Sequence, residues 1–590
     1  MKNIVSKILF SLTTLFILNQ FCFADENEQI LKAMRDEIHR SLSSLSISGL
    51  QKPYYIEYKL IVRNSFEIKS VYGSLVESSN NKHAILTVGV RVGNYKLDNT
   101  NYFDFGLSFF GSGDDEERFK SRTIPVELDY PALRRELWLA TDAAYKQVTE
   151  TYTKKETTLK NRVIKDTTWD FTQIPPEKNY FDSKAPGFDK PYFEDLSKKL
   201  SAIFGSYPDI NTSSVGIEYL PETDYYVNSE GMEYTKNDFY AGIEIVAATQ
   251  SSDGMPYVDY FTAFARDPKN FPVVDSLMKA TKGVAENLSN LTKAQILDES
   301  YSGPILFTGQ ASAQLFAQQF APNLVTQREP LTEQGKQDND RFTAYQNKIG
   351  GRVLPEFLSI VDEPLKTKYE KSELIGNFIL DDEGVKPEEV NLVNAGYLKN
   401  LLSTRIPTKR VRKTNGHQRG GAAMWGILEM NSDKSHSKSF EDLKEQMIKL
   451  CKDRELPFGI IVTKLIDQNI LFTTLFRITA GTYPIGQIQT NIPIIEAYKI
   501  YQDGRIELIR GCEVRGINAQ SFKDVLNVGK EKYALNLLSS PVVSPFMSGG
   551  SQYITASVIV PSLLFEDGEI KPLENDFPKP PIMKSPVSVK

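Results

Sequence analysis

The sequence predicts an α+β protein in which an N-terminal antiparallel sheet with long helices precedes a C-terminal β-rich, barrel-like domain. Three observations support this fold class. The 590 residues exceed what one hydrophobic core normally holds, so two or three domains are expected. Aromatic residues, which favour sheet, make up 11% of the chain. The C-terminal half is dense in strand-like runs and contains one sizeable helical segment.

The first 24 residues have the pattern of a secretory signal peptide. Lys2 and Lys7 form a basic start, residues 8–18 are apolar, and Cys22 and Ala24 place small residues at the −3 and −1 positions of a cleavage site. We therefore expect cleavage after Ala24 and an exported protein, periplasmic or extracellular. Acylation of Cys22, the lipoprotein alternative, is less favoured because the three preceding residues are unlike a lipoprotein site. No later stretch reaches 18 apolar residues, so no membrane span is expected after cleavage.

Residues 25–270 are expected to form the N-terminal domain. Helical spacing marks residues 25–45, a long segment opened by Pro131, and residues 193–204. Strand-like runs occupy residues 54–63, 66–77, 84–92, 215–220, 238–249 and 257–265, with a bulge at Gly73, a turn at Asn80-Asn81 and a hairpin at 229–231. The charged residues 154–162 are interpreted as a solvated helix face, and residues 107–212 as a divergent helical insert.

Residues 271–590 are expected to form the C-terminal domain. Helices are expected at 271–291 and 440–454, and strands at 458–466, 492–501, 505–511 and 553–565. Hairpin turns are expected at Gln502-Asp503-Gly504 and Glu566-Asp567-Gly568. Cys451 follows apolar residues at helical spacing, which favours a buried thiol, while a disulfide with Cys512 stays open.

Charge and motif content argue against several classes of function. Lys2 and Lys7 are the charged side chains of residues 1–24, so the remaining chain holds 67 basic and 75 acidic residues, with no basic excess to hold nucleic acid. A zinc site usually needs three or four ligands, and none of the four histidines forms a ligand pair at helical spacing. The sequence has neither a Gly-x-Ser-x-Gly elbow nor a P-loop.

A series of segments in the second half carries a family resemblance. The stretch PILFTGQASAQLFAQQFAPNL, residues 304–324, is an apolar strand that leads into a helix stopped by Pro322. It is followed in order by SIVDEPLKTKY (359–369), FILDDEGV (378–385), VNAGYLKNLLSTR (393–405), KTNGHQRGG (413–421) and IEAYKIYQDGRIELIRGCEVRG (495–516). Together they resemble the TldD/PmbA family of metallopeptidases over roughly residues 213–590, with a weaker match in 54–100.

The resemblance implies a metal-binding helix whose ligands are replaced here. Zinc-bearing members of the family carry HExxxH, and its positions fall on Gly309, Gln310 and Gln314. The third family ligand, a Cys, would fall in residues 539–552, which contain no Cys. Glycine offers no ligand, and a neutral amide is a poor substitute for His, thiolate or carboxylate. Gln310 cannot titrate and so cannot act as a general base. We therefore expect no metal cofactor and no catalytic residue.

The resemblance also implies a peptide-binding groove, bordered by the Asp-Asp-Glu-Gly turn and the Gly- and Arg-containing loop. Substrate-binding residues expected on this basis are Asp381, Asp382, Glu383, Arg405, His417 and Arg419. An arginine can hold a peptide carboxylate in bidentate fashion, and a sheet edge can bind an extended peptide through its main chain. The alternative for Arg405 and Arg419 is solvated surface, as it is for the acidic turn.

Three functional hypotheses remain open at this point. The favoured one is a non-catalytic TldE/PmbA-type protein, a peptide-binding or partner subunit of a proteolytic complex. The resemblance implies that it pairs with a TldD-like, HExxxH-bearing chain or forms a homodimer. The second is an active metal-dependent peptidase whose metal comes from other ligands or from a partner chain. The third is an unrelated exported protein that binds carbohydrate or lipid.

Overall fold

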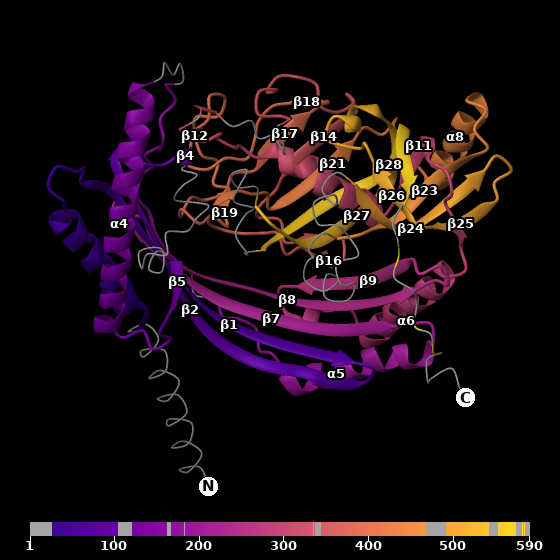
Figure 1. The fold of residues 1–590 in the computed structure, drawn as a ribbon, viewed down its shortest axis with the longest axis horizontal. Coiled ribbons are helices and arrows are strands. Elements are labelled where there is room, and N and C mark those ends of the chain that lie inside the picture. Colours follow the sequence, from indigo (N-terminus) through magenta and orange to yellow (C-terminus); the bar gives the residue numbers. More distant parts are fainter. Residues whose placement is uncertain are drawn as a thin grey trace, which may run out of the picture.

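The computed structural model describes residues 26–573 except 104–120, 162–166, 182, 334, 337–343, 468–490 and 542–552, together with residues 577, 581 and 583. The expected signal peptide, residues 1–24, lies outside the described residues, as does most of the segment 539–552. In Figure 1 a long, curved sheet from the first half of the chain lies beneath a β-rich body formed by the second half.

The first half of the chain forms the expected antiparallel sheet. Its described strands are β1 (Pro53–Val71), β2 (Ser74–Asn94), β3 (Leu97–Asp98), β5 (Ser121–Ile124), β6 (Lys178–Tyr180), β7 (Thr212–Asn228), β8 (Glu233–Gln250) and β9 (Pro256–Ala265). Their order is β3-β2-β1-β7-β8-β6, with β5 paired to β2 and β9 to β8. The short β6 is parallel to β8, and the long strands pair antiparallel with each other.

Helices cover one face of this sheet. They are residues 26–44, α4 (Tyr130–Lys160), α5 (Lys190–Ala202) and α6 (Val274–Leu291). Asp129 begins α4 by accepting the Ala132 N–H, and Pro131 occupies its first turn. Residues 26–44 and α4 pack on Tyr58 and Leu60 of β1. Further along the same face, α5 packs beside Ile68 of β1 and α6 packs on β8 and β9 (Figure 1). The opposite face is therefore left for the C-terminal half.

The second half forms a mostly antiparallel sheet that closes into a five-stranded barrel. The barrel strands are β11 (Tyr301–Phe307), β23 (Phe458–Leu465), β24 (Ile492–Tyr501), β26 (Cys512–Arg515) and β28 (Ile554–Pro572). The ring closes because β26 pairs with both β24 and β28. Strands that extend this sheet are β10 (Gln295–Ile296), β14 (Leu358–Asp362), β17 (Val390–Asn394), β18 (Tyr397–Leu398), β21 (Ile427–Ser432), β22 (Ser437–Lys438), β25 (Ile506–Arg510) and β27 (Val525–Ser539).

Short elements complete this half. The helical segments are α7 (Gln310–Leu315), the π-helical turn η3 (Phe316–Phe320), the 3-10 turn η4 (Ala321–Leu324) and α8 (Phe440–Asp453). The small ribbons are β4 (Tyr102–Phe103) with β12 (Leu331–Thr332) and β13 (Gly335–Lys336), β15 (Lys368–Tyr369) with β16 (Ser372–Glu373), and β19 (Gln418–Arg419) with β20 (Ala422–Ala423). Among the described residues, no helix is both long enough and apolar enough to cross a bilayer.

One expected bulge and two expected turns are wrong. The first ribbon turns at Tyr72 and Gly73, which both have positive φ, so Gly73 is a turn residue and not a bulge. Asn80-Asn81 instead lies within β2, opposite β1. The hairpin expected at residues 566–568 is absent because β28 runs straight through Gly568, which faces Gly303 of β11.

Other expectations concern single side chains. Cys451 is buried as expected, and Cys512 is also a free, buried thiol, so the two do not form a disulfide. Burial raises the pKa of Cys451 to about 11 and that of Cys512 to about 12. The interpretation of residues 154–162 as a solvated face is wrong at Lys155, which is buried and pairs with Asp170 at 2.6 Å.

Candidate functional site

The helix at the family's metal position begins at Gly309, directly after strand β11. Gly309 has φ of 57° and ψ of −126°, and a Cβ added there would meet no atom within 4 Å. The backbone conformation, and not a lack of space, therefore favours glycine at the first motif position. This residue presents no side chain that could bind a metal.

Gln310, at the position of the family's Glu, is held by both ends of its amide. Its Nε2 donates to the Tyr260 hydroxyl at 2.6 Å and to the Leu465 carbonyl at 3.0 Å. Its Oε1 accepts the Leu465 N–H at 2.9 Å. The amide therefore pairs with the end of β23 as a backbone peptide group would. A carboxylate could accept the N–H but could not donate to the carbonyl, so this geometry selects glutamine over glutamate.

Gln314, at the position of the second His, is only 1% exposed. Its Oε1 has no hydrogen-bond partner among the described residues. One turn later, Gln318 donates to the Ile466 carbonyl at 2.8 Å. Glutamines 310, 314 and 318 thus lie along one helix face beside the end of β23. No group of three or more His, Cys, Asp or Glu side chains suited to a metal is present in the described part of the chain. Gly309, Gln310 and Gln314 do not fit a zinc ion.

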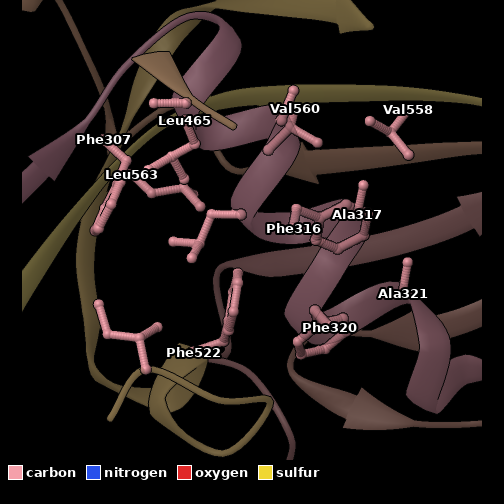
Figure 2. Close-up of a cluster of buried hydrophobic side chains, with 14 of the residues drawn as sticks. Phe307, Phe316, Ala317, Phe320, Ala321, Leu465, Phe522, Val558, Val560 and Leu563 are labelled. Carbon is pink, nitrogen blue, oxygen red and sulfur yellow. The ribbon is translucent and has the colours of Figure 1, made fainter. Parts of the chain in front are cut away.

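The other face of this helix is apolar and fixes it in the core (Figure 2). Leu315, Phe316 and Phe320 are fully buried and form an apolar stripe. The rings of Phe316 and Phe320 stack at 5.5 Å, and Phe522 approaches Phe320 at 4.9 Å. The segment therefore keeps the packing of a structural helix although its motif positions carry no ligand.

A cavity of about 490 Å³ lies on the face of the N-terminal sheet that the helices leave uncovered. Strand side chains alternate between faces, so residues such as Lys59, Glu218 and Lys236 point to the cavity while their neighbours pack under the helices. The C-terminal half supplies the opposing wall, which includes Phe378 and Tyr553. Asp467 also lines the cavity and directly follows Leu465 and Ile466, the residues to which the helix glutamines bind.

Two of the six residues expected to bind substrate line this cavity. The Oδ1 of Asp382 lies 2.8 Å from the Lys59 ammonium, and its Oδ2 accepts the Gly420 N–H at 2.8 Å. Burial alone would raise the pKa of Asp382, but Lys59 and Lys236 hold it well below its usual value. Arg419 stacks 4.5 Å from the ring of Phe378 and donates to the Thr555 carbonyl. Burial lowers the pKa of Arg419 to about 10, although Asp238 opposes the change.

The other four expected residues lie buried behind the cavity. Asp381 accepts the N–H groups of Glu383 and Val385 and so builds the turn, and burial raises its pKa to about 7. Glu383 accepts the Arg405 N–H, and its pKa is raised to about 8 by burial, against the nearby Arg405 charge. His417 contacts the Asn415 carbonyl through Nδ1, and its Nε2 lies 3.9 Å from Asp362 with no hydrogen-bond partner among the described residues. Burial lowers the pKa of His417 to about 4.

Arg405 is fully buried and joins the two halves of the chain. Its Nε and Nη2 donate to the Thr172 carbonyl, and its Nη2 pairs with Glu230 at 2.7 Å. The guanidinium carbon lies 4.0 Å from the centre of the Phe171 ring. Because Arg419 is buried as well, the solvated-surface alternative is wrong for both arginines. In this arrangement Asp382 and Arg419 face the cavity and Arg405 does not.

The N-terminal sheet contributes cavity residues that the sequence motifs did not single out. Lys59, Asp224 and Lys236 surround Asp382, with Lys–Asp distances between 2.8 and 3.8 Å. For Asp224 the sequence signal is the alternation along β7, where Glu218, Glu222 and Asp224 share one face of the strand. Strand β7 lies outside the segments of residues 304–516 that carry the family resemblance most clearly.

Comparison with known proteins identifies a family model that matches the C-terminal half and one curated relative. Residues 300–571 match the family model described as the PmbA/TldA metallopeptidase C-terminal domain. Over 113 residues the chain is 28% identical to a metalloprotease from Archaeoglobus fulgidus. This match spans 19% of this chain and about a quarter, 24%, of the relative.

Solved structures resemble almost the whole chain. A candidate modulator of a DNA gyrase from Thermotoga maritima has a TM-score of 0.55 at 14% identity, covering 91% of this chain and 100% of that one. TldE from Thermococcus kodakarensis has a TM-score of 0.55 at 13% identity, covering 91% and 99%. A candidate modulator of DNA gyrase from Bacteroides thetaiotaomicron has a TM-score of 0.53 at 12% identity, covering 92% and 98%. These identities show a shared fold, and with the match of residues 300–571 the chain belongs to the TldD/PmbA family.

Proposed function

We propose that this protein is an exported, non-catalytic member of the TldD/PmbA family that binds peptide segments as a subunit of a proteolytic complex. The observation that carries the proposal is the side-chain amide of Gln310. Both of its groups are engaged by Leu465 and Tyr260, at the position where the family's HExxxH motif has its glutamate. An amide does not titrate near neutral pH, so this residue cannot accept a proton from an attacking water.

The neighbouring motif positions support the same conclusion. Zinc in proteins is bound by His, Cys, Asp or Glu, and this chain offers Gly309 and Gln314 at the two His positions. Losing one ligand could leave an enfeebled peptidase, whereas losing both ligands and the base removes every group that the motif contributes. The helix nevertheless keeps its buried apolar face.

The cavity supports a role in binding peptides. Its volume of about 490 Å³ lies within the range of ligand-binding pockets, and its walls combine charged and aromatic side chains. For a TldE/PmbA-type protein, the resemblance implies a TldD-like partner that carries HExxxH. We propose such a partner and keep a homodimer as the second arrangement. Export rests on the basic and apolar pattern of residues 1–24.

Metal analysis and a peptidase assay on the mature chain test this proposal. We expect no stoichiometric zinc and no hydrolysis of unfolded peptides by the protein alone. Stoichiometric zinc with chelator-sensitive hydrolysis would instead establish the active-peptidase alternative. The partner is tested by affinity purification of the tagged protein from its native host. We expect an HExxxH-bearing chain to co-purify, and recovery of this chain alone, as a dimer, would establish the homodimer.

A further inference from the structure

The described residues that line the cavity carry an excess of negative charge. They include nine carboxylates and five cationic side chains. At one end these charges are paired, because Lys59 contacts Asp382 at 2.8 Å and Arg63 contacts Glu222 at 2.8 Å. The excess therefore lies elsewhere along the floor of the cavity.

The unbalanced end is formed by carboxylates on two adjacent strands. Glu67 of β1 lies directly opposite Glu218 of β7. Like charges opposite one another destabilise a sheet. Among the described residues, no Lys or Arg lies within ion-pair distance of Glu67 or Glu218. This arrangement costs folding stability, which a bound cation would offset.

A second observation on the same strand points to a ligand. Asp224 lines the cavity but is only 3% exposed, and its Oδ1 has no hydrogen-bond partner among the described residues. Its Oδ2 lies 3.6 Å from Lys59 and 3.8 Å from Lys236, beyond hydrogen-bond distance. A buried carboxylate oxygen without a donor is costly, so an N–H group from a ligand would complete this end of the cavity.

The opposing wall fits side chains that combine an aliphatic stem with a charged end. Phe378, Leu538 and Tyr553 line it. Lysine and arginine bury their methylene stems against such surfaces while the charged group reaches polar partners. Carboxylates on the floor and apolar groups on the wall are therefore complementary to basic residues of a peptide.

The spacing along β7 fits an extended ligand. Glu218, Leu220, Glu222 and Asp224 lie at successive positions of one face of β7, which repeat every ~6.6 Å, so three of these four positions carry a carboxylate. An extended peptide repeats its side chains with the same period. We infer that the cavity selects extended peptide segments that carry lysine or arginine, whose charged ends Glu67 and Glu218 would hold. This inference rests on the proposed peptide-binding function and adds the class of peptide.

Isothermal titration calorimetry of the mature chain at low salt and pH 8 tests the inference. Three peptides of equal length would alternate serine with lysine, glutamine or glutamate. We expect the lysine peptide to bind at least about tenfold more tightly than the glutamine peptide, and the glutamate peptide to bind most weakly. Equal affinity for the lysine and glutamine peptides would overturn the inference and leave peptide binding intact. Absence of binding by all three would overturn the proposed function as well.

Variants test whether the cavity carboxylates cause the preference for the lysine peptide. Glu218→Gln and Glu67→Gln each remove one charge without changing size, and each should weaken the lysine peptide about fivefold while leaving the glutamine peptide unchanged. Glu150→Gln is the matched control, because Glu150 lies on α4, on the far face of the sheet, with its side chain 53% exposed. Equal losses in the control and the cavity variants would contradict the inference. The comparison of peptides on the unchanged protein does not depend on the folding of any variant.

Discussion

The side-chain amide of Gln310 should contribute measurably to the stability of the protein. Gln310→Glu should lower the free energy of unfolding by about 1–3 kcal/mol at pH 8, because a carboxylate cannot donate to the Leu465 carbonyl that Gln310 now contacts at 3.0 Å. Urea denaturation measures the change. Gln520→Glu, at an exposed position, makes the same chemical change and should cost nothing. Equal unfolding midpoints for both variants would show that the amide is not needed to hold the helix.

Glu218 gives a prediction about pH. Burial, followed by the charge of Glu244, raises the pKa of Glu218 to about 7. The folded state then binds this proton more tightly than the unfolded chain, so the carboxyl costs stability as the pH rises through 7. Charged or titratable groups that act on it are Arg63 and Glu67 on β1, and Tyr240 and Glu244 on β8.

The corresponding variant is Glu218→Gln. It should be more stable than the unchanged protein by roughly 1–2 kcal/mol at pH 8, after allowing for solvent screening. The two proteins should be equally stable near pH 4.5, where the carboxyl is protonated in the folded state. Denaturation curves at both pH values measure this difference. A gain of the same size at both values would mean that charge is not its cause.

At the scale of elements, the sequence predicts those whose pattern is local. Helix α4 follows from Pro131 and its apolar spacing, and strands β23 and β24 follow from continuous apolar runs. The misplaced turns have a different origin. Asn80-Asn81 and Glu566-Asp567-Gly568 carry turn-forming residues but lie in strands, because long-range pairing outweighs local preference. The true turn, at Tyr72-Gly73, places tyrosine at a φ of 48°, which no sequence rule favours.

Gly376 packs closely against the backbone of Gly426 and Ser557. A Cβ added there would lie 2.2 Å from the Gly426 carbonyl oxygen and 2.6 Å from the Ser557 nitrogen, both backbone atoms. Gly376→Ala should therefore destabilise the protein by about 3 kcal/mol or more and displace the segment that leads to Phe378. Gly283→Ala, in the exposed part of α6 with no atom within 4 Å, should instead stabilise by about 0.5–1 kcal/mol. Thermal melting of both variants measures the contrast, and a shift of the same sign would refute it.

At the scale of the whole molecule, the candidate site is made by two halves that no single motif spans. The sequence motifs locate Asp382 and Arg419, and both line the cavity. They do not locate Lys59 or Glu218, because these residues reach the cavity only through strand alternation and the docking of one half on the other. The same docking buries Arg405, whose burial depends on Phe171 and Thr172 of a distant connector.

Arg405 also provides a test of how the halves are joined. Arg405→Gln removes a buried charge, leaves the Thr172 carbonyl without its arginine donor, and leaves Glu230 with the Tyr95 hydroxyl but no charged partner there. It should therefore cost about 3–5 kcal/mol and lower the melting temperature of the whole chain. Arg405→Lys keeps the charge but not the planar set of donors, and it should recover part of the loss. Arg505→Gln, at a side chain 66% exposed, is the control.

Binding measurements on the same variants separate a structural role from contact with substrate. If Arg405 holds the halves together, Arg405→Lys should melt earlier than the unchanged protein yet bind the lysine peptide with the same affinity below its melting temperature. If Arg405 contacts substrate, affinity should fall while the melting temperature stays the same. The guanidinium donates to the Thr172 carbonyl and pairs with Glu230, and Arg405 does not line the cavity, so we expect the first outcome.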